Sequence, residues 1–170
     1  MKNIVGDLFK QKCDAIVITT NGFVKANGAN VMGMGCAKTA RDMVDGVDKI
    51  LGHCIKTHGN NVNLILANPG RIALVSFPVK PVSLPYNENK IVRHMRKKIT
   101  NGTIPGWACI ADVDIIRRSA HQLVEMADSM GWTNVVLPRP GCGAGELSYD
   151  DIEPILQEIL DDRFSVITFK

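Results

Sequence analysis

Two apolar runs that each lead into a glycine-rich loop constrain the fold of this chain more than any other feature of its sequence. Ala15–Thr19, rich in isoleucine and valine, is followed by Asn27–Gly35, which holds three glycines and two asparagines. Val135–Leu137 ends at a proline and is followed by Pro140–Glu146, which holds three more glycines. Helical composition follows each loop, so the order strand, loop, helix occurs twice, which is typical of an α/β protein.

Apolar spacing and turn residues place the other elements. Asp114–Met130 carries apolar residues at helical spacing and stops at Gly131, and Asn68-Pro69-Gly70 separates two apolar runs that predict a β-hairpin. Strands that alternate with helices predict a mostly parallel sheet covered on both faces, with the hairpin adding an antiparallel element. We expect strands at Met1–Val5, Ala15–Thr19, Leu64–Ala67, Ile72–Phe77, Val135–Leu137 and Ser165–Phe169, and helices at Cys36–Val44, Asp114–Met130 and Tyr149–Leu160.

The length and composition of the chain suit one compact domain. With 170 residues, of which 45% are apolar, residues 1–170 are expected to form a single domain around its own core. The segment 81–106 departs from the alternation of strands and helices, because it holds three prolines, a basic cluster and little apolar periodicity. We expect this segment to be an insertion or a flap.

The formal net charge of +3 does not by itself indicate a nucleic-acid partner. Its distribution is more informative, because Lys90–Lys98 holds five lysines and arginines together with His94 and no acidic residue. Such a stretch, with Trp107 nearby, can bind nucleic acid through phosphate contacts and stacking, or it can be an ordinary solvated surface. No heptad pattern demands a partner subunit, so the oligomeric state stays open.

Cysteine usage and the absence of an apolar signal segment predict a cytoplasmic protein. The five cysteines include no Cys-x-x-Cys pair and no histidine at zinc-site spacing, so we expect a reduced compartment, no metal and no cofactor. No apolar run approaches the length needed to span a bilayer, so no membrane contact is expected. Cys13 and Cys54 are interpreted as small core residues. Cys36 and Cys142 lie in the loops and are interpreted as packing residues rather than nucleophiles, because no histidine is near either in sequence.

Both glycine-rich loops have the composition of an anion site. Gly33–Ala37 leads directly into a helix, so its main-chain amides can approach an anion and the helix N-terminus favours negative charge. Pro140–Glu146 repeats this arrangement after the second strand. Either loop alone could be a packing turn, but two such loops at the carboxyl edge of one sheet can bind a diphosphate from both sides.

Four motifs, in order along the chain, resemble the macrodomain family. They are Gly6-Asp7-Leu8-Phe9, Asp14-Ala15-Ile16-Val17 continuing to Asn21, Met32-Gly33-Met34-Gly35-Cys36-Ala37, and Leu137-Pro138-Arg139-Pro140-Gly141-Cys142-Gly143 followed by Glu146-Leu147. The resemblance covers nearly the whole chain except the segment 81–106. It implies a three-layer α/β/α sandwich around a mixed, mostly parallel central sheet, and ADP-ribose or an ADP-ribosylated substrate as the partner.

Within that family the chain looks most like the branch that contains terminal ADP-ribose protein glycohydrolase and the DNA ADP-ribosyl glycohydrolase antitoxins. Ser76-Phe77-Pro78-Val79-Lys80 resembles the Phe-Pro-Thr-Lys of the antitoxins, whose lysine is catalytic. The resemblance therefore implies Lys80 as the key catalytic group, with Asn21, near the distal ribose, as a second catalytic residue. In the protein-directed enzyme an aspartate of the second loop assists the lysine, whereas this chain has Gly145 there, as the DNA-directed relatives do.

The resemblance also assigns groups that contact the ligand. Asp7, with Leu8 beside it, corresponds to a carboxylate that accepts a hydrogen bond from the adenine amino group, and Phe169 corresponds to an aromatic residue that lies against adenine. Asp7 could instead cap a turn, and Phe169 could be an ordinary core residue. The full set of expected ligand-binding residues is Asp7, Leu8, Asn21, Gly33, Met34, Gly35, Cys36, Ala37, Pro140, Gly141, Cys142, Gly143, Ala144, Gly145, Glu146 and Phe169.

Three functions are compatible with these patterns. The first is hydrolysis of an ADP-ribosyl linkage to nucleic acid, to protein or in ADP-ribose 1″-phosphate, with Lys80 as the catalytic residue. The second is non-catalytic binding or sequestration of ADP-ribose or a related nucleotide signal. The third is nucleic-acid binding through Lys90–Lys98 alone.

Overall fold

The computed structural model describes all 170 residues and contains a six-stranded central sheet with the order β1-β8-β7-β2-β4-β3. Every neighbouring pair in this sheet is parallel except β3 and β4, which are antiparallel, so the predicted mixed, mostly parallel sheet is confirmed. The strands of the central sheet are β1 (Lys2–Val5), β2 (Ala15–Asn21), β3 (Asn63–Leu66), β4 (Ala73–Lys80), β7 (Val135–Pro138) and β8 (Phe164–Thr168). The helices are α1 (Gly35–Met43), α2 (Val47–His58), α3 (Val113–Met130) and α4 (Tyr149–Ile159).

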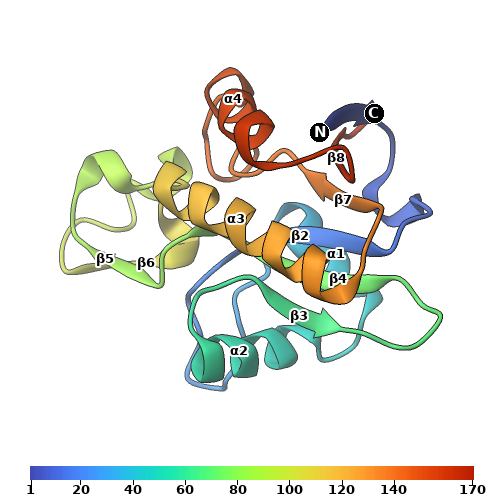
Figure 1. Cartoon of the computed structure of the whole chain (residues 1–170). Helices are drawn as coiled ribbons and strands as arrows, with labels where there is room; N and C mark the ends of the chain where they lie inside the picture. Colours follow the sequence, from blue (N-terminus) through green and yellow to red (C-terminus); the bar gives the residue numbers. More distant parts are fainter.

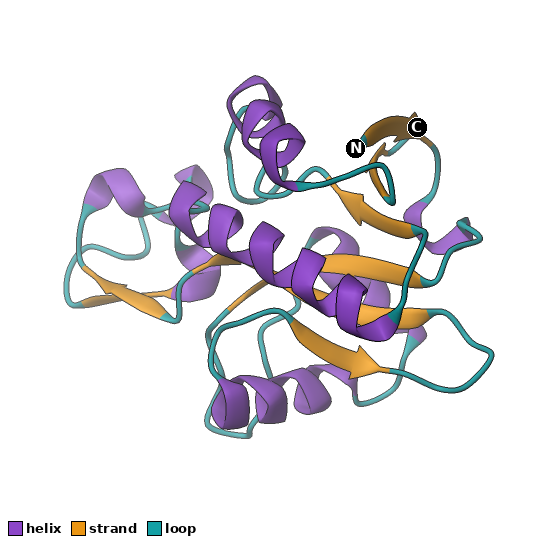
Figure 2. Ribbon diagram, in the orientation of Figure 1, coloured by secondary structure: helices purple, strands orange, loops and turns teal.

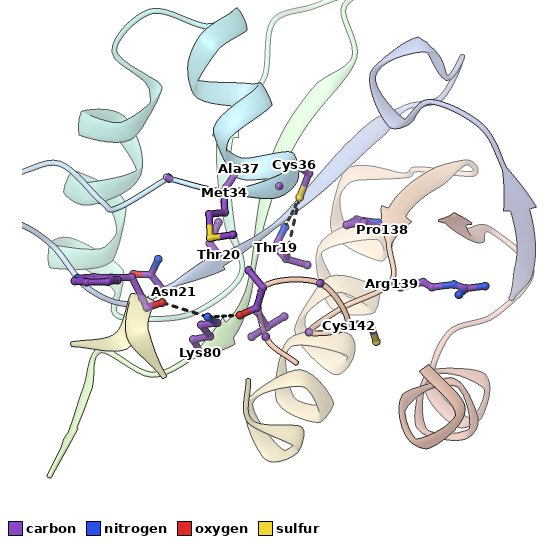
Figure 3. A pocket seen from close by; sticks show the side chains of 18 of the residues that line it. Thr19, Thr20, Asn21, Met34, Cys36, Ala37, Lys80, Pro138, Arg139 and Cys142 are labelled. Atoms are coloured by element: carbon purple, nitrogen blue, oxygen red, sulfur yellow. Dashed lines mark hydrogen bonds between the residues drawn. The ribbon is translucent and has the colours of Figure 1, made fainter. Parts of the chain in front are cut away.

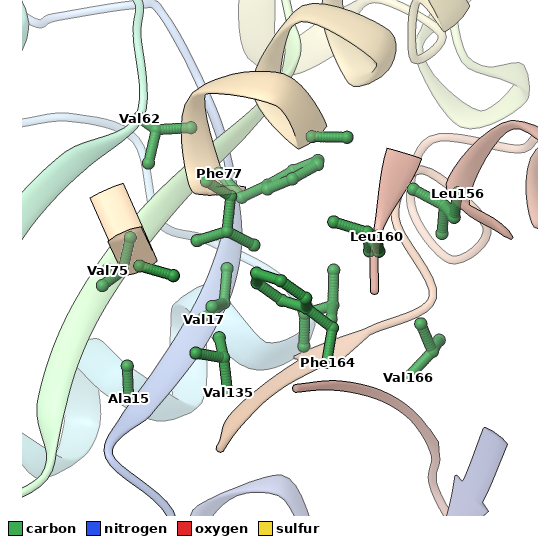
Figure 4. Packing of buried hydrophobic residues seen from close by; sticks show 14 of the residues in the cluster. Ala15, Val17, Val62, Val75, Phe77, Val135, Leu156, Leu160, Phe164 and Val166 are labelled. Carbon is green, nitrogen blue, oxygen red and sulfur yellow. The ribbon is translucent and has the colours of Figure 1, made fainter. Parts of the chain in front are cut away.

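Alternation of apolar side chains along the strands divides the core into two layers. Ala15 and Val17 of β2 belong to the larger cluster, which α3 and α4 cover, while Ile16 and Ile18 belong to the smaller cluster beneath α1 and α2. The picture agrees, because α3 crosses the front of the sheet and α1 lies behind it (Figures 1 and 2). Phe77 and Phe164 are fully buried in the larger layer (Figure 4). The predicted three-layer sandwich is confirmed.

The helix and hairpin predictions agree with the structure within a few residues at the element ends. α3 ends at Gly131, which adopts the left-handed conformation (φ 68°) and donates its N–H to the last turn. β8 ends at Thr168, so Phe169 lies just beyond the strand on which it was expected. α2 is a helix that the sequence patterns did not predict, although its buried residues Val47, Leu51 and Ile55 recur at every fourth position.

The segment from Pro81 to Ala108, called here the 81–108 segment, forms a small unit beside the sandwich. Its strands β5 (Ser83–Pro85) and β6 (Thr103–Pro105) pair as a two-stranded sheet that projects away from the central sheet in Figure 1. Together with the adjoining Cys109, residues of this segment bury a four-residue apolar cluster, Ile91, Ile104, Ala108 and Cys109. No helix anywhere in the structure has the length and apolar character required to cross a membrane.

Candidate ligand-binding site

The pairing of β2 with β7 places both glycine-rich loops at one edge of the sheet. The two strands are parallel neighbours, so their carboxyl ends point the same way and their loops meet. A pocket of about 1160 Å³ lies between the loops, with Lys80 and Asn21 at one end and Arg139 at the other (Figure 3). Most residues predicted to act in the site line this pocket, namely Asn21, Gly33, Met34, Gly35, Cys36, Ala37, Lys80, Gly141, Cys142, Gly143, Ala144, Gly145 and Phe169.

The first loop presents main-chain donors that have no partner in the protein. α1 begins at Gly35, and no side chain caps its N-terminus. The main-chain N–H groups of residues 33–35 donate to no other group of the protein. Free amides at a helix N-terminus are a favourable environment for an anion, because the partial positive charges of the first turn add to the hydrogen bonds. The geometry therefore supports the anion site expected at this loop.

The second loop is folded tightly and presents donors of the same kind. Its turn depends on Gly141, which has a φ of 75°, and the N–H of Leu147 donates to Gly141 O over 3.0 Å. The N–H groups of Gly143, Ala144 and Gly145 have no acceptor in the protein, so three successive amides remain for a ligand.

Gly145 has no room for a side chain. An added Cβ would lie 2.5 Å from Gly141 O and 2.6 Å from the Cβ of Ala111. A carboxylate at position 145 therefore requires a different path of the loop, so the site has to work without an acid at this point.

The pocket lining is positively charged and contains no aspartate or glutamate. Lys25, Lys80 and Arg139 contribute cationic side chains, and His94 contributes an imidazole. This one-sided distribution favours an anionic ligand, because a pocket lined by charges of one sign concentrates its field on the ligand.

Lys80 ends β4 and is nearly inaccessible, with 7% of its surface exposed. Its ammonium donates to the main-chain oxygen of Ala144 over 2.9 Å and to that of Trp107 over 3.2 Å, so it joins the second loop to the 81–108 segment. Burial lowers the pKa of Lys80 from its ordinary value to about 8, an effect that the Glu146 carboxylate partly opposes. About a tenth of the Lys80 side chains are therefore neutral amines at pH 7.

Asn21 lies directly beside Lys80, because a shift in the β2–β4 register pairs these two residues. Its side chain is already bonded within the protein: Nδ2 donates to Val31 O over 2.8 Å, and Oδ1 accepts the N–H of Phe23 over 2.9 Å. The buried Asn30 also donates to Asn21 O. Asn21 therefore shapes the loop around the lysine, and its amide has little capacity left for a ligand.

The two loop cysteines have the surroundings of packing residues. Burial raises the pKa of Cys36, whose Sγ accepts the N–H of Thr19. Burial also raises the pKa of Cys142, to about 11, and its Sγ donates to Pro140 O. Thiols with raised pKa values hold almost no thiolate at neutral pH, which argues against a nucleophilic role.

Four residues of the predicted set lie outside the pocket lining: Asp7, Leu8, Pro140 and Glu146. Asp7 caps a short 3-10 helix (Leu8–Lys10) by accepting the N–H of Phe9, and its carboxylate lies 3.6 Å from the ammonium of Lys10. Its neighbour Gly6 donates to Thr168 O, which keeps Asp7 close to the Phe169 end of the pocket. Leu8 is fully buried below it.

Several lining residues were missed in the sequence, and most of them come from loops far apart along the chain. Arg139 stacks on the ring of Tyr149, with its guanidinium carbon 4.2 Å from the ring centre. Phe23, His94 and Trp107 lie at the pocket as well. Arg139 lies in the recognised motif Leu137–Gly143. Trp107 lies in the 81–108 segment, which contains no recognised motif, so its position at the pocket was not predictable from the sequence.

Comparisons of this structure with solved structures identify the architecture. The macrodomain of Thermus aquaticus DarG superposes with a TM-score of 0.72 at 16% identity, covering 99% of this chain and 97% of that one. The macrodomain of Mycobacterium tuberculosis DarG gives a TM-score of 0.68 at 17% identity, covering 97% and 96% of the two chains. The chain has the macrodomain fold.

A third solved structure with a similar fold carries a ligand. Thermosipho africanus DarTG in complex with ADP-ribose gives a TM-score of 0.71 at 14% identity. The match covers 99% of this chain and 42% of the other, longer chain. No family model and no curated protein matches the sequence, so the macrodomain architecture rests on three-dimensional similarity.

Wild type and Lys80→Met should differ in how stability depends on pH. With a pKa of about 8 when folded and about 10.4 when unfolded, Lys80 holds more protons in the unfolded chain between these values. The free energy of unfolding of wild type should therefore rise with pH in this window, by about 1 kcal/mol per pH unit relative to Lys80→Met. Urea denaturation of both proteins at about pH 7.5 and about pH 9.5 measures this change. If the difference in the free energy of unfolding between the two proteins is the same at both pH values, Lys80 keeps its ordinary pKa.

Proposed function

We propose that this macrodomain binds ADP-ribose in the pocket between its two glycine-rich loops and hydrolyses an ADP-ribosyl linkage there. The observation that carries the proposal is the placement of Lys80, a buried amine at one end of a cation-lined pocket whose loops present unpartnered amides. The complex of Thermosipho africanus DarTG with ADP-ribose, which shares the fold, supports the choice of ligand.

The geometry gives the ligand a direction in the pocket. The amides of residues 33–35 and 143–145 are suited to the diphosphate, because they offer hydrogen bonds from both sides. Arg139, Tyr149 and Phe169 line the pocket and provide flat surfaces for adenine, with Asp7 nearby. This orientation would direct the distal ribose toward Asn21 and Lys80, which lie at the other end of the pocket from Arg139 in Figure 3.

Lys80 is suited to act on the anomeric carbon of the distal ribose. Its neutral amine attacks this carbon while the bond from the carbon to the ADP-ribosylated group of the substrate breaks. That group leaves with the bonding electrons and takes up a proton. Water then releases ADP-ribose from the adduct and regenerates the amine. Holding the diphosphate fixed keeps the anomeric carbon in reach of the amine, which is where binding energy contributes to the rate.

ADP-ribose should bind about tenfold more tightly than ADP, which lacks the distal ribose. NAD should also bind more weakly, because its nicotinamide group competes for space near Lys80. Isothermal titration calorimetry with the three ligands measures the order. Lys80→Ala should keep its affinity for ADP-ribose within about threefold, since the loops supply most of the contacts. Absence of any ADP-ribose binding by the wild type would overturn the proposal.

Turnover should depend on Lys80 and on its protonation state. For an attacking amine with a pKa of about 8, kcat/KM should rise about tenfold per pH unit below this value and level off above it, because only the neutral form reacts. Lys80→Ala and Lys80→Arg should both lose at least about a hundredfold in kcat, as the guanidinium stays protonated. Release of ADP-ribose from ADP-ribosylated DNA and protein is the measurement. A rate that falls above this pKa would instead assign Lys80 as a general acid.

Non-catalytic binding remains the second candidate, and one observation favours it. The ammonium of Lys80 donates to two main-chain oxygens, so the residue could serve only to hold the loop and the 81–108 segment together. Turnover by wild type and by Lys80→Ala distinguishes the two candidates. A binding module keeps its affinity and shows no turnover in either protein, whereas an enzyme loses turnover in the variant.

We propose further that residues 1–170 act as one domain in which the 81–106 segment forms a flap that contacts nucleic acid. His94 lines the pocket, so the basic stretch Lys90–Lys98 adjoins its mouth. Single-stranded DNA should then bind with strong salt dependence, and Lys97→Ala with Lys98→Ala should reduce the slope of log K against log salt by about 0.7 per lysine. Lys2→Ala with Lys12→Ala, at the far edge of the sheet, is the matched control. Absence of measurable DNA binding at low salt would refute the proposed contact with nucleic acid.

A further inference from the structure

Glu146 occupies an unusual position in the second loop. It is the one residue other than glycine with a positive φ, at 62°, a conformation that L side chains rarely adopt. It lies outside the pocket lining, and its carboxylate turns toward the 81–108 segment. A strained backbone in a loop is retained when the side chain makes a contact that a relaxed conformation would lose.

The contact made by Glu146 is to a main-chain donor of the 81–108 segment. Oε1 accepts the N–H of Arg93 over 2.8 Å, across 53 residues of sequence. The Arg93 guanidinium adds little, because its Nε is 3.9 Å from Oε2 and the arginine side chain is 86% exposed. Glu146 is therefore linked to the 81–108 segment mainly through the Arg93 N–H and not through the guanidinium. This hydrogen bond lies next to His94, which lines the pocket.

A second link between the same two parts of the chain passes through Lys80. Its ammonium donates to Ala144 O in the second loop and to Trp107 O in the 81–108 segment. The distance between the loop and the segment thus decides whether both oxygens can accept from one ammonium. Any group that fixes this distance also fixes the position of the amine.

We propose that Glu146 is a positioning residue, which fastens the 81–108 segment to the second glycine-rich loop through the N–H of Arg93 and thereby holds the two carbonyl oxygens that orient the Lys80 amine. This inference rests on the proposed function of Lys80. It assigns no contact with substrate to Glu146.

Hydrogen exchange tests the fastening without reference to any reaction. In Glu146→Gly the loop keeps its conformation, because glycine accepts a φ of 62° freely, but the acceptor is gone. Amides of residues 91–95 and 106–109 should exchange at least about tenfold faster than in wild type.

Two variants of Arg93 separate the main-chain donor from the side chain. Arg93→Pro removes the N–H together with the guanidinium side chain, whose loss alone Arg93→Ala measures. The site is the first position of a 3-10 helix, where proline is tolerated, and Val92 already has a compatible conformation (φ −59°, ψ 144°). It should reproduce the fast exchange of Glu146→Gly, and the double variant should exchange no faster than either single one. Arg93→Ala and Glu146→Gln, which both keep the hydrogen bond, should retain the protection of wild type. Protection in Glu146→Gly or Arg93→Pro equal to that of wild type overturns the proposal.

Turnover then tests whether the fastening positions the amine. Glu146→Gly should lower kcat by about tenfold while the Kd for ADP-ribose stays within about threefold. In Glu146→Gln the midpoint of the pH profile should move down, because the Glu146 carboxylate no longer stabilises the Lys80 ammonium, while Cys109 and His94 remain in place. Equal kcat values for Glu146→Gly and wild type overturn the positioning role even if exchange is faster. Absence of turnover in wild type would refute the proposed hydrolysis, and the exchange experiment would still decide whether Glu146 fastens the segment.

Discussion

The hydrogen bonding of β2 to β7 on one side and to β4 on the other is the constraint on which the rest of the site depends. All three strands run in the same direction, so the loop after β2, the loop after β7 and the last residue of β4 meet at one edge. The register shift at the end of β2 then sets Asn21 directly against Lys80. Residues more than a hundred positions apart in the sequence become the walls of one pocket because the sheet is parallel there.

The site combines a favourable and a costly arrangement of polar groups. The loop amides belong to residues that line the pocket and have no acceptor in the protein, so water must satisfy them until a ligand arrives. The Lys80 ammonium is the costly element, because burial opposes its charge and only two carbonyl oxygens replace water around it. The buried ammonium therefore reduces the stability of the empty protein, and this cost is consistent with the role proposed for Lys80.

The sequence predicted the parts of this structure that follow from local patterns. Continuous apolar runs identified β2 and β7, Gly131 marked the end of α3, and an Asn-Pro-Gly turn marked the hairpin of β3 and β4. α2 was missed even though Val47, Leu51 and Ile55 are spaced as a buried helical face, because polar residues and a glycine interrupt the apolar pattern. The carbonyl partners of Lys80 and the acceptor role of Glu146 had no local signal, since both join the second loop to the 81–108 segment, which is remote in sequence.

The absence of carboxylates from the pocket affects how fast a ligand can arrive as well as how tightly it stays. Lys25 and Arg139 both line the pocket, so their field acts on an approaching anion before it reaches its final position. Such a field raises the rate of productive encounters by about tenfold or more, and its reach shortens as mobile ions screen it. For the nucleotide diphosphate proposed above as the ligand, this field favours capture at low concentration, whereas uncharged nucleosides gain no comparable advantage.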